Sequence, residues 1–94
     1  MSYLITHFYE GGTKEQYEAV LAAVHPADGL PPGQTHHVAG ATDGGYLVVA
    51  VWDSKESNDR FIQETLMPTL PNVQGGFEGP PQERTAEVDN LVTG

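Results

Sequence analysis

Apolar, β-branched and aromatic positions gather in short stretches that Gly- and Pro-rich turns separate. Three such stretches run from Tyr3 to Tyr9, from Gln34 to Ala41 and from Tyr46 to Asp53. This composition between turn residues is typical of strands, so we predict a strand in each. A fourth, weakly apolar strand is predicted from Glu83 to Asp89.

The segment after the first strand has the apolar spacing of a helix. Its apolar residues recur at i, i+3, i+4 and i+7 and are Tyr17, Val20, Leu21 and Val24. This spacing places one apolar stripe on a helix that packs against a core. Thr13 and Gln16 predict a capping box at its start. Pro26 ends it, because proline disfavours helical geometry in the preceding residue.

A second helix is predicted after the third strand. Asp53 or Ser54 caps its start, and its buried stripe consists of Phe61, Ile62 and Leu66. Pro68 ends or kinks this helix. The segments 27–33 and 71–82 are rich in turn residues and are predicted to be loops.

The turn between the second and third strands predicts how these strands pair. Asp43-Gly44 favours a two-residue hairpin with a type I′ turn. The register that follows pairs Thr42 with Gly45, Val38 with Val49, His37 with Ala50 and Thr35 with Trp52. A slip of one residue would move every side chain of the strand to the other face of the sheet.

The order β-α-β-β-α-β is the split βαβ arrangement. We therefore predict one ferredoxin-like α+β domain over residues 1–94, a four-stranded antiparallel sheet with two helices on one face. The third strand is apolar on both of its faces, which indicates a sheet that is covered on both sides. Since the helices cover one face only, we expect the open face to pack on a second copy in a homodimer.

Charge and composition remove several classes of partner. Thirteen acidic and four basic residues give a net charge of −9. The bases do not cluster, so neither nucleic acid nor an anionic membrane surface is an expected partner. The absence of cysteine excludes disulfides and thiolate metal sites. No apolar run approaches the roughly 18 residues of a membrane span, and the first residues do not form a signal peptide. We expect a cytoplasmic protein.

These residues resemble the dimeric α/β-barrel superfamily, in particular its antibiotic-biosynthesis-monooxygenase type. The resemblance covers nearly the whole chain. It rests on the strand ending Val51-Trp52-Asp53-Ser54 with Phe61 beyond it, and on the short first strand followed by a Gly turn and helix. The segment from His37 through Gly45 and on to Trp52 is also similar to small bacterial members. The resemblance implies a small-molecule enzyme, because the superfamily includes cofactor-free oxygenases of polycyclic phenols, haem-degrading oxygenases, polyketide cyclases and lactone isomerases.

Residue by residue, the resemblance argues against haem. The haem-degrading branch uses an asparagine on the first strand, a tryptophan in the second helix and a histidine beyond that helix. In this chain His7 and Phe61 stand near the first two positions, and Pro71 falls near the third. The polyketide cyclases also use a histidine after the second helix, where this chain has none. We expect neither haem nor another cofactor.

Two strand histidines are the candidate catalytic residues. His36 and His37 are adjacent, so their side chains point to opposite faces, and the predicted register places His37 with Ala50 and Trp52. If that face borders a cavity, His37 is the best candidate general base, because an imidazole suits proton transfer at neutral pH. The alternative is a half-buried structural histidine.

His7 lies on the first strand at a position that, by the resemblance, looks into the pocket. There it would hold a substrate hydroxyl or carbonyl, or it is a core histidine bonded to a backbone carbonyl. A metal site made by His7 and His37 is not expected, because the third strand separates them and no third ligand is evident. His25, at the end of the first helix, is interpreted as a structural imidazolium at the helix dipole.

Aromatic residues suggest a pocket for a flat organic substrate. Trp52, Tyr17 and Phe61 are the candidate substrate-binding residues, although such residues are also needed simply as core. Asn90, just past the fourth strand, is a further candidate at the pocket mouth. Two functions remain open: a cofactor-independent monooxygenase, isomerase or cyclase with a histidine base, and a non-catalytic dimer that binds a small hydrophobic metabolite or is structural.

Overall fold

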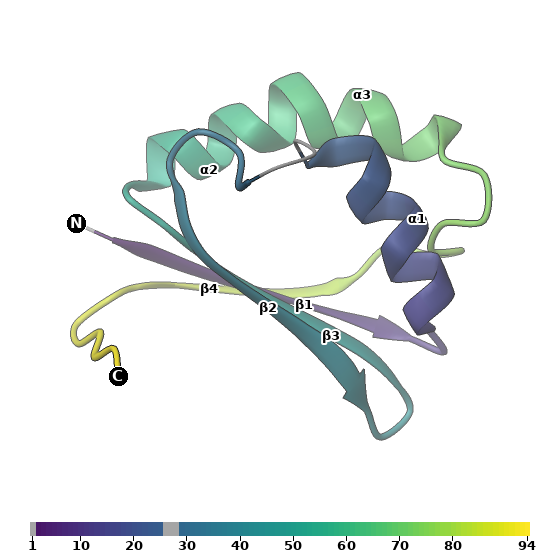
Figure 1. Ribbon diagram of the computed structural model, residues 1–94, viewed down its shortest axis with the longest axis horizontal. Coiled ribbons are helices and arrows are strands. Elements are labelled where there is room, and N and C mark those ends of the chain that lie inside the picture. The colour runs from purple at the N-terminus through teal and green to yellow at the C-terminus, as the bar shows by residue number, and fades with distance from the viewer. Residues whose placement is uncertain (1, 26–28) are drawn as a thin grey trace.

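The computed structural model describes residues 2–25 and 29–94. In chain order the elements are β1 (Tyr3–Glu10), α1 (Lys14–Val24), β2 (Gln34–Thr42), β3 (Gly45–Trp52), α2 (Lys55–Phe61), a π-helical turn η1 (Ile62–Leu66), α3 (Met67–Thr69), a 3-10 turn η2 (Leu70–Asn72) and β4 (Gln82–Glu87) (Figure 1). The predicted order β-α-β-β-α-β is confirmed.

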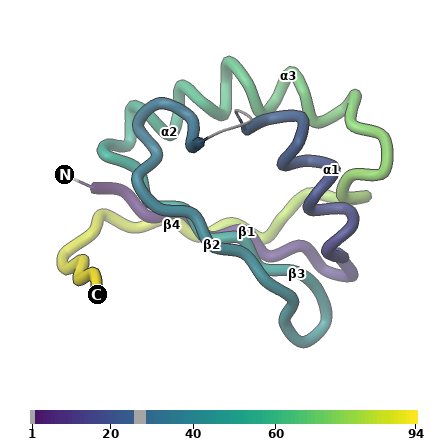
Figure 2. Tube along the Cα trace, in the orientation of Figure 1, coloured from purple at the N-terminus to yellow at the C-terminus, as the bar shows by residue number. Residues whose placement is uncertain are grey.

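The four strands form one antiparallel sheet in the order β2-β3-β1-β4. The path of the chain carries α1 and the helical run from α2 to α3 across the same face of this sheet (Figures 1 and 2). This is the predicted ferredoxin-like α+β fold. None of the helices in the described residues lies over the opposite face of the sheet, and Val38 there is 64% exposed. No helix in the described part of the chain is long and apolar enough to cross a membrane.

The start of α1 is the predicted capping box. The backbone N–H of Gln16 donates to the Thr13 hydroxyl at 3.2 Å, and the backbone N–H of Thr13 donates to Gln16 Oε1 at 3.0 Å. At the other end the backbone N–H of His25 donates to the carbonyl of Leu21 at 2.9 Å. The predicted stop at Pro26 and the beginning of the predicted loop, residues 27 and 28, lie outside the described residues.

Of the two predicted effects of Pro68 on the second helix, an end or a kink, the structure excludes the end. Ser54 caps α2, where its hydroxyl accepts from the backbone N–H of Ser57 at 3.2 Å. The run does not end at Pro68. The π turn η1 precedes the proline, which occupies the first turn of α3, where its missing N–H disturbs the helix least. The helical run then ends with η2, whose last residue is Asn72.

The hairpin turn is two residues long, as predicted, but its type differs. Gly44 has a φ of +81°, whereas no residue other than glycine has a positive φ in the described part of the chain. A type I′ turn needs positive φ at both central residues, and Asp43 therefore excludes it. The glycine alone takes the left-handed conformation that the turn requires.

The register of β2 on β3 is confirmed over most of its length and wrong at one end. The pairs Thr42–Gly45, Val38–Val49 and His37–Ala50 occur as predicted. Near the start of β2 an irregularity between Gln34 and His36 inserts one extra residue, so Gln34 pairs with Trp52 in place of Thr35. The Thr35 hydroxyl instead donates to the carbonyl of Val51 at 3.2 Å. Such a bulge reverses the facing of the residues on its far side.

Candidate functional site

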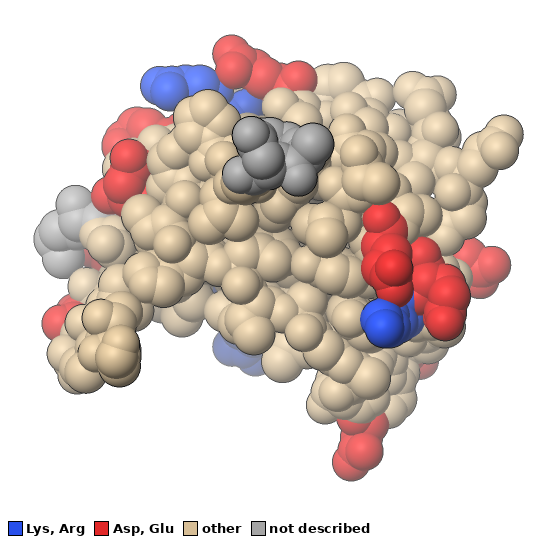
Figure 3. Space-filling view, in the orientation of Figure 1, with Lys and Arg blue, Asp and Glu red and all other residues tan. Residues whose placement is uncertain are grey.

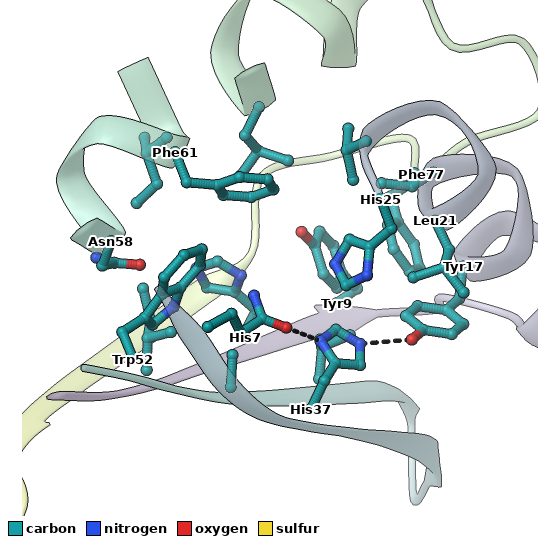
Figure 4. Close-up of a pocket in the computed structure, with 18 residues that line it drawn as sticks. His7, Tyr9, Tyr17, Leu21, His25, His37, Trp52, Asn58, Phe61 and Phe77 are labelled. Carbon is teal, nitrogen blue, oxygen red and sulfur yellow. Dashed lines mark hydrogen bonds between the residues drawn. The ribbon is translucent and has the colours of Figure 1, made fainter. Parts of the chain in front are cut away.

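A pocket lies between the sheet and the helices (Figure 4). Its cavity volume is about 70 Å³. Side chains from β1, β2 and β3 form its floor, and α1, α2, η1 and the loop before β4 supply the rest. The lining residues are Ile5, His7, Tyr9, Tyr17, Val20, Leu21, Val24, His25, Gln34, His37, Val48, Ala50, Trp52, Asn58, Phe61, Ile62, Leu66 and Phe77.

The fold brings most of the sequence-predicted candidates into this pocket. Those that line it are His7, His37, Tyr17, Trp52 and Phe61. Asn90 does not, since it is exposed beyond the end of β4. His36 is exposed, and its Nδ1 lies 2.9 Å from the Thr35 hydroxyl. The alternation along β2 therefore turns His37 toward the helices.

His37 is held on both of its ring nitrogens. Its Nε2 lies 2.6 Å from the Tyr17 hydroxyl, and its Nδ1 lies 2.9 Å from Gln34 Oε1 (Figure 4). Because the Gln34 oxygen can only accept, the hydrogen of the neutral imidazole is on Nδ1. Nε2 then accepts from the Tyr17 O–H. The three side chains form one directed chain of hydrogen bonds.

The surroundings keep both His37 and Tyr17 neutral. Burial, with a smaller contribution from the neighbouring His25, lowers the pKa of His37 to about 4. Burial, and then Tyr46, raises the pKa of Tyr17 above its ordinary value. Desolvation disfavours the charged form of each group, which has opposite effects on an imidazole and a phenol. At neutral pH the site therefore holds an uncharged base beside an uncharged acid.

The bulge in β2 is what places Gln34 in this chain. In a regular strand residues three apart point to opposite faces, so Gln34 and His37 would be on different sides of the sheet. The extra residue at the bulge brings both to the pocket, where Gln34 is 8% exposed. Sequence reasoning missed Gln34, since no local pattern in this segment signals a bulge.

His25 also belongs to the pocket, although the sequence suggested only a structural imidazolium. Its ring lies 4.7 Å from that of His37, centroid to centroid, in an edge-to-face arrangement. Burial lowers the pKa of His25. The helix dipole therefore does not make this histidine a cation, and a neutral ring packs at the end of α1.

His7 pairs with a carboxylate. Its Nε2 lies 2.9 Å from Glu83 Oε2, where the side chain of His7 is 13% exposed and that of Glu83 49%. The carboxylate accepts, so Nε2 carries the hydrogen and Nδ1 is the basic nitrogen of the neutral ring. The partner comes from β4, next to β1 in the sheet, and not from a backbone carbonyl as one alternative suggested.

The far end of the pocket is formed by Trp52, Phe61 and Asn58. The rings of Trp52 and Phe61 lie 5.2 Å apart at 42°. Asn58 is only 3% exposed. Its position three residues before Phe61 puts both on one helix face, a signal that would have identified it. Figure 4 shows this group and Tyr17 at opposite ends of the pocket.

Phe77, in the loop before β4, closes part of the pocket wall. Its ring stacks on Tyr9 with 3.7 Å between centroids and 7° between planes. The ring centroids of Tyr46 and Tyr17 lie 5.2 Å apart. Sequence reasoning placed Phe77 in a predicted loop and gave it no role, because its contact with Tyr9 joins segments far apart in the chain.

Among the described residues, the pocket lining contains no carboxylate, ammonium or guanidinium group. Charged side chains gather near the edges of the face that Figure 3 shows, and most of the surface between them is uncharged. In the described part of the chain no three His, Asp or Glu side chains are grouped to hold a metal ion. The arrangement suits an uncharged organic ligand.

No family model matches the sequence, and no curated protein is significantly similar to it. Solved structures are similar over nearly the whole chain. A Chloroflexus aurantiacus protein described as an antibiotic biosynthesis monooxygenase aligns over 100% of both chains with a TM-score of 0.65 and 18% identity. SnoaB, a cofactor-independent oxygenase from Streptomyces nogalater, aligns over 97% of this chain and 95% of its own with a TM-score of 0.64 and 18% identity.

The monooxygenase ActVA-Orf6 of Streptomyces coelicolor, solved in complex with nanaomycin D, aligns over 99% of this chain and 91% of its own. Its TM-score is 0.59 and its identity 17%. At these identities the likeness is one of fold. The chain has the ferredoxin-like α+β fold of the antibiotic-biosynthesis-monooxygenase-type proteins.

Proposed function

We propose that the protein is a small-molecule enzyme that oxidises an aromatic or polyketide-like compound without a cofactor, with a pocket histidine as its base. The hydrogen-bonded chain from Tyr17 through His37 to Gln34 in an otherwise apolar pocket carries this proposal. SnoaB is a cofactor-independent oxygenase and ActVA-Orf6 a monooxygenase, and their shared fold with this chain supports the reaction class.

In the proposed mechanism the substrate loses a proton to the chain of hydrogen bonds. A phenolic O–H donates to the Tyr17 oxygen while the Tyr17 hydrogen moves to His37 Nε2. Gln34 Oε1 holds the Nδ1–H, so Nε2 stays directed at Tyr17. His7, with its Nε2 on Glu83, is the second base and takes a C–H proton.

The low pKa of His37 makes it a weak base in the empty pocket, but a bound anion changes the balance. The lowering to about 4 corresponds to roughly 3 kcal/mol against the imidazolium. A phenolate bonded to the far side of the Tyr17 hydroxyl lies about 5 Å from that imidazolium and attracts it by roughly 3 kcal/mol at an effective dielectric of about 20. This attraction offsets the penalty of burial, so protonation of His37 is favoured more with the substrate anion than in the empty pocket.

Oxygen then reacts with the substrate carbanion. A C–O bond forms at the activated carbon, and proton uptake gives a hydroperoxide. Loss of the remaining hydrogen from that carbon with cleavage of the O–O bond leaves a carbonyl and one water. The sum converts CH₂ and O₂ into C=O and H₂O; carbon is oxidised, oxygen is reduced, and no external reductant is needed.

Oxygen uptake with a panel of naphthols and anthrones tests this proposal. We expect turnover with one O₂ consumed per product, and we expect the His37→Ala/His7→Ala double variant to be inactive. His36→Ala is the matched control, since it removes an exposed histidine of the same strand, and it should retain activity. Unchanged turnover by the double variant would rule out a histidine base.

A second function is favoured by the size of the cavity. At about 70 Å³ it is well below the several hundred Å³ of typical ligand pockets, and a flat polycyclic compound must displace side chains to enter. A non-catalytic protein that binds a small hydrophobic metabolite fits this volume. Saturable binding of a probe without oxygen uptake across the panel would favour it.

We also propose that two copies pair through the open sheet face. Val38 on β2 is 64% exposed and Leu47 on β3 is 37% exposed. Each follows or precedes a pocket-facing residue, His37 or Val48, in its strand, so both side chains lie on the face of the sheet away from the pocket. Apolar residues exposed together on a sheet face are typical of an interaction surface, and a second copy presents the same residues by two-fold symmetry.

A further inference from the structure

A second cavity lies beside the pocket, and the ring of Phe77 helps to separate the two. This cavity, of about 200 Å³, lies between the turn after β1 and the loop before β4. Tyr9 and Phe77 line both cavities, and their rings are stacked with 3.7 Å between centroids (Figure 4). Gly12 leaves room for this stack, since a Cβ there would lie 3.0 Å from Phe77 Cε1. A flat ring of a ligand would lie on Tyr9 in the same way as Phe77 does.

The small volume of the pocket requires that a side chain moves when a ligand binds. At about 70 Å³ it is smaller than the engineered cavity of about 150 Å³ that holds benzene in another protein. Even a ligand with one flat ring must therefore displace part of the lining. Withdrawal of Phe77 would join the pocket to the second cavity and bring the space close to the roughly 300 Å³ at which ordinary ligand pockets begin.

The loop that carries Phe77 is weakly attached to the rest of the domain. No backbone hydrogen bond joins residues 74–81 to a strand or helix within residues 2–25 and 29–94. Gly75, with a φ of +77°, and Gly76 precede Phe77, and Gly79 follows it. Glycine changes its backbone angles at little cost, and most of this loop is exposed. Lids that open over binding sites are drawn from segments of this kind.

We propose that residues 74–81 are a lid whose plug is Phe77. When a ligand binds, the ring of Phe77 leaves Tyr9, a flat ring of the ligand takes its place, and the two cavities become one site. The inference rests on the small-molecule pocket of the proposed function and does not need its chemistry. In the ligand-free protein, the same plug keeps the face of Tyr9 covered.

The contact between Phe77 and Tyr9 can be followed in the wild-type protein, with 2-naphthol as a two-ring probe. In the free protein the two rings should give strong nuclear Overhauser effects, because they are stacked. We expect saturation with 2-naphthol to abolish these effects and to give new ones between the naphthol and Tyr9. A Tyr9–Phe77 contact that persists in the saturated complex would overturn the proposal.

A reversible lock on the loop provides the second measurement. A Cβ added at Gly76 would lie 3.2 Å from Val20 Cγ2 on α1, a spacing at which a sulfur on each residue can form a disulfide. The chain has no cysteine, so the Val20→Cys/Gly76→Cys variant can form only this bond. We expect the oxidised variant to bind 2-naphthol at least about tenfold more weakly than the reduced variant, because the locked lid populates the open state less. Wild type treated with the same oxidant is the control, and its affinity should not change.

The outcomes separate this inference from the proposed function. Equal affinities of the reduced and oxidised variants for 2-naphthol would overturn the lid while leaving the pocket as a binding site. Failure of the wild type to bind 2-naphthol at millimolar concentration would overturn the lid and the small-molecule pocket together. If the double variant does not fold or does not oxidise, the Tyr9–Phe77 contact in the wild-type complex decides.

Discussion

His37 is the residue around which the pocket is organised, and its neutrality follows from its neighbours. Gln34 fixes the hydrogen on Nδ1, Tyr17 donates to Nε2, and the ring of His25 lies 4.7 Å away. Protonation would place a second hydrogen against the Tyr17 O–H and a charge in an apolar pocket. Each of these contacts favours the neutral ring. The lowered pKa of His37 should therefore be visible in the pH dependence of both stability and activity.

The first prediction concerns stability. Because the pKa of His37 is lowered from 6.5 to about 4, the unfolded state binds more protons between these values, and the folded state loses stability as pH falls through this window. The loss in the free energy of unfolding has an upper limit of about 3 kcal/mol, and partial solvent access to His37 reduces the expected loss to about 1–2 kcal/mol. Urea unfolding at several pH values measures it.

His37→Gln is the control for this pH dependence, since it removes the titrating group and keeps a polar side chain. The free energy of unfolding of the variant should decline less steeply below pH 6.5 than that of the wild type. If the free energies of unfolding of variant and wild type changed equally with pH, His37 would not have a lowered pKa. His25, whose pKa burial also lowers, contributes equally to both proteins and cancels in the difference.

The second prediction concerns activity and rests on the proposed function. His37 must be neutral to accept the phenolic proton, so the part of the acid limb of kcat/KM that belongs to His37 should lie near its pKa of about 4 and not in the ordinary histidine range. An acid limb centred at the ordinary histidine pKa would instead assign catalysis to another group. The measurement is the rate of oxygen uptake at low substrate concentration.

Among the elements, the bulge in β2 has the largest effect on the site. It turns Gln34 to the same side as His37 and pairs Gln34 with Trp52 across the hairpin. If β2 paired regularly through Thr35, with Thr35 opposite Trp52, Gln34 would face away from the pocket and the His37 Nδ1–H would lose its acceptor. A bulge that orients a side chain beside a functional site is a recurrent use of this irregularity.

Gln34→Leu tests the contact that the bulge creates. The substitution should cost about 1–3 kcal/mol, because it leaves a half-buried donor of His37 unpaired, and the Nδ1–H resonance should exchange faster with water. Thr35→Ala keeps the bulge and loses only the hydroxyl contact to Val51, so it should keep that resonance. Equal effects of the two changes would contradict the assignment.

A further prediction concerns the N-terminal cap of α1 and does not depend on the proposed function. Thr13→Ala removes the acceptor of the Gln16 N–H and should lower the free energy of unfolding by about 1 kcal/mol. Thr13→Ser keeps a capping hydroxyl and should stay close to the wild type. Denaturant unfolding compares the two, and a neutral Thr13→Ala would show that the cap contributes no stability.

At the scale of the whole molecule, the layers are asymmetric. Helices cover one face of the sheet, and the other presents Val38 and Leu47 to solvent. A chain of 94 residues buries a smaller fraction of its surface than a larger domain does. Pairing of two sheets through this face would add buried apolar area that the single chain lacks.

We expect sedimentation at micromolar concentration to give the mass of two chains. Val38→Glu should shift the protein toward one chain, because it places two like charges at a two-fold interface in a protein of net charge −9. Val92→Glu is the matched control, since Val92 is 80% exposed beyond β4. Dissociation by both variants, or by neither, would argue against pairing through the sheet.

The sequence by itself determined the elements and the fold, because these depend on patterns within short segments. Apolar spacing, the Thr13–Gln16 box and the two-residue length of the turn at Asp43-Gly44 each depend on a few neighbouring residues and appear in the structure as predicted, whereas the turn type does not. The same local periodicity, carried through the hairpin register, placed His37 opposite Ala50.

Only the tertiary structure decided which groups meet inside the pocket. Glu83 reaches His7 across 76 positions of sequence, and Phe77 stacks on Tyr9 from a loop. These contacts depend on how strands and helices distant in the chain pack together. Patterns within short segments do not specify that packing. For this reason the contacts that define the chemistry of the site could be identified only in the folded chain.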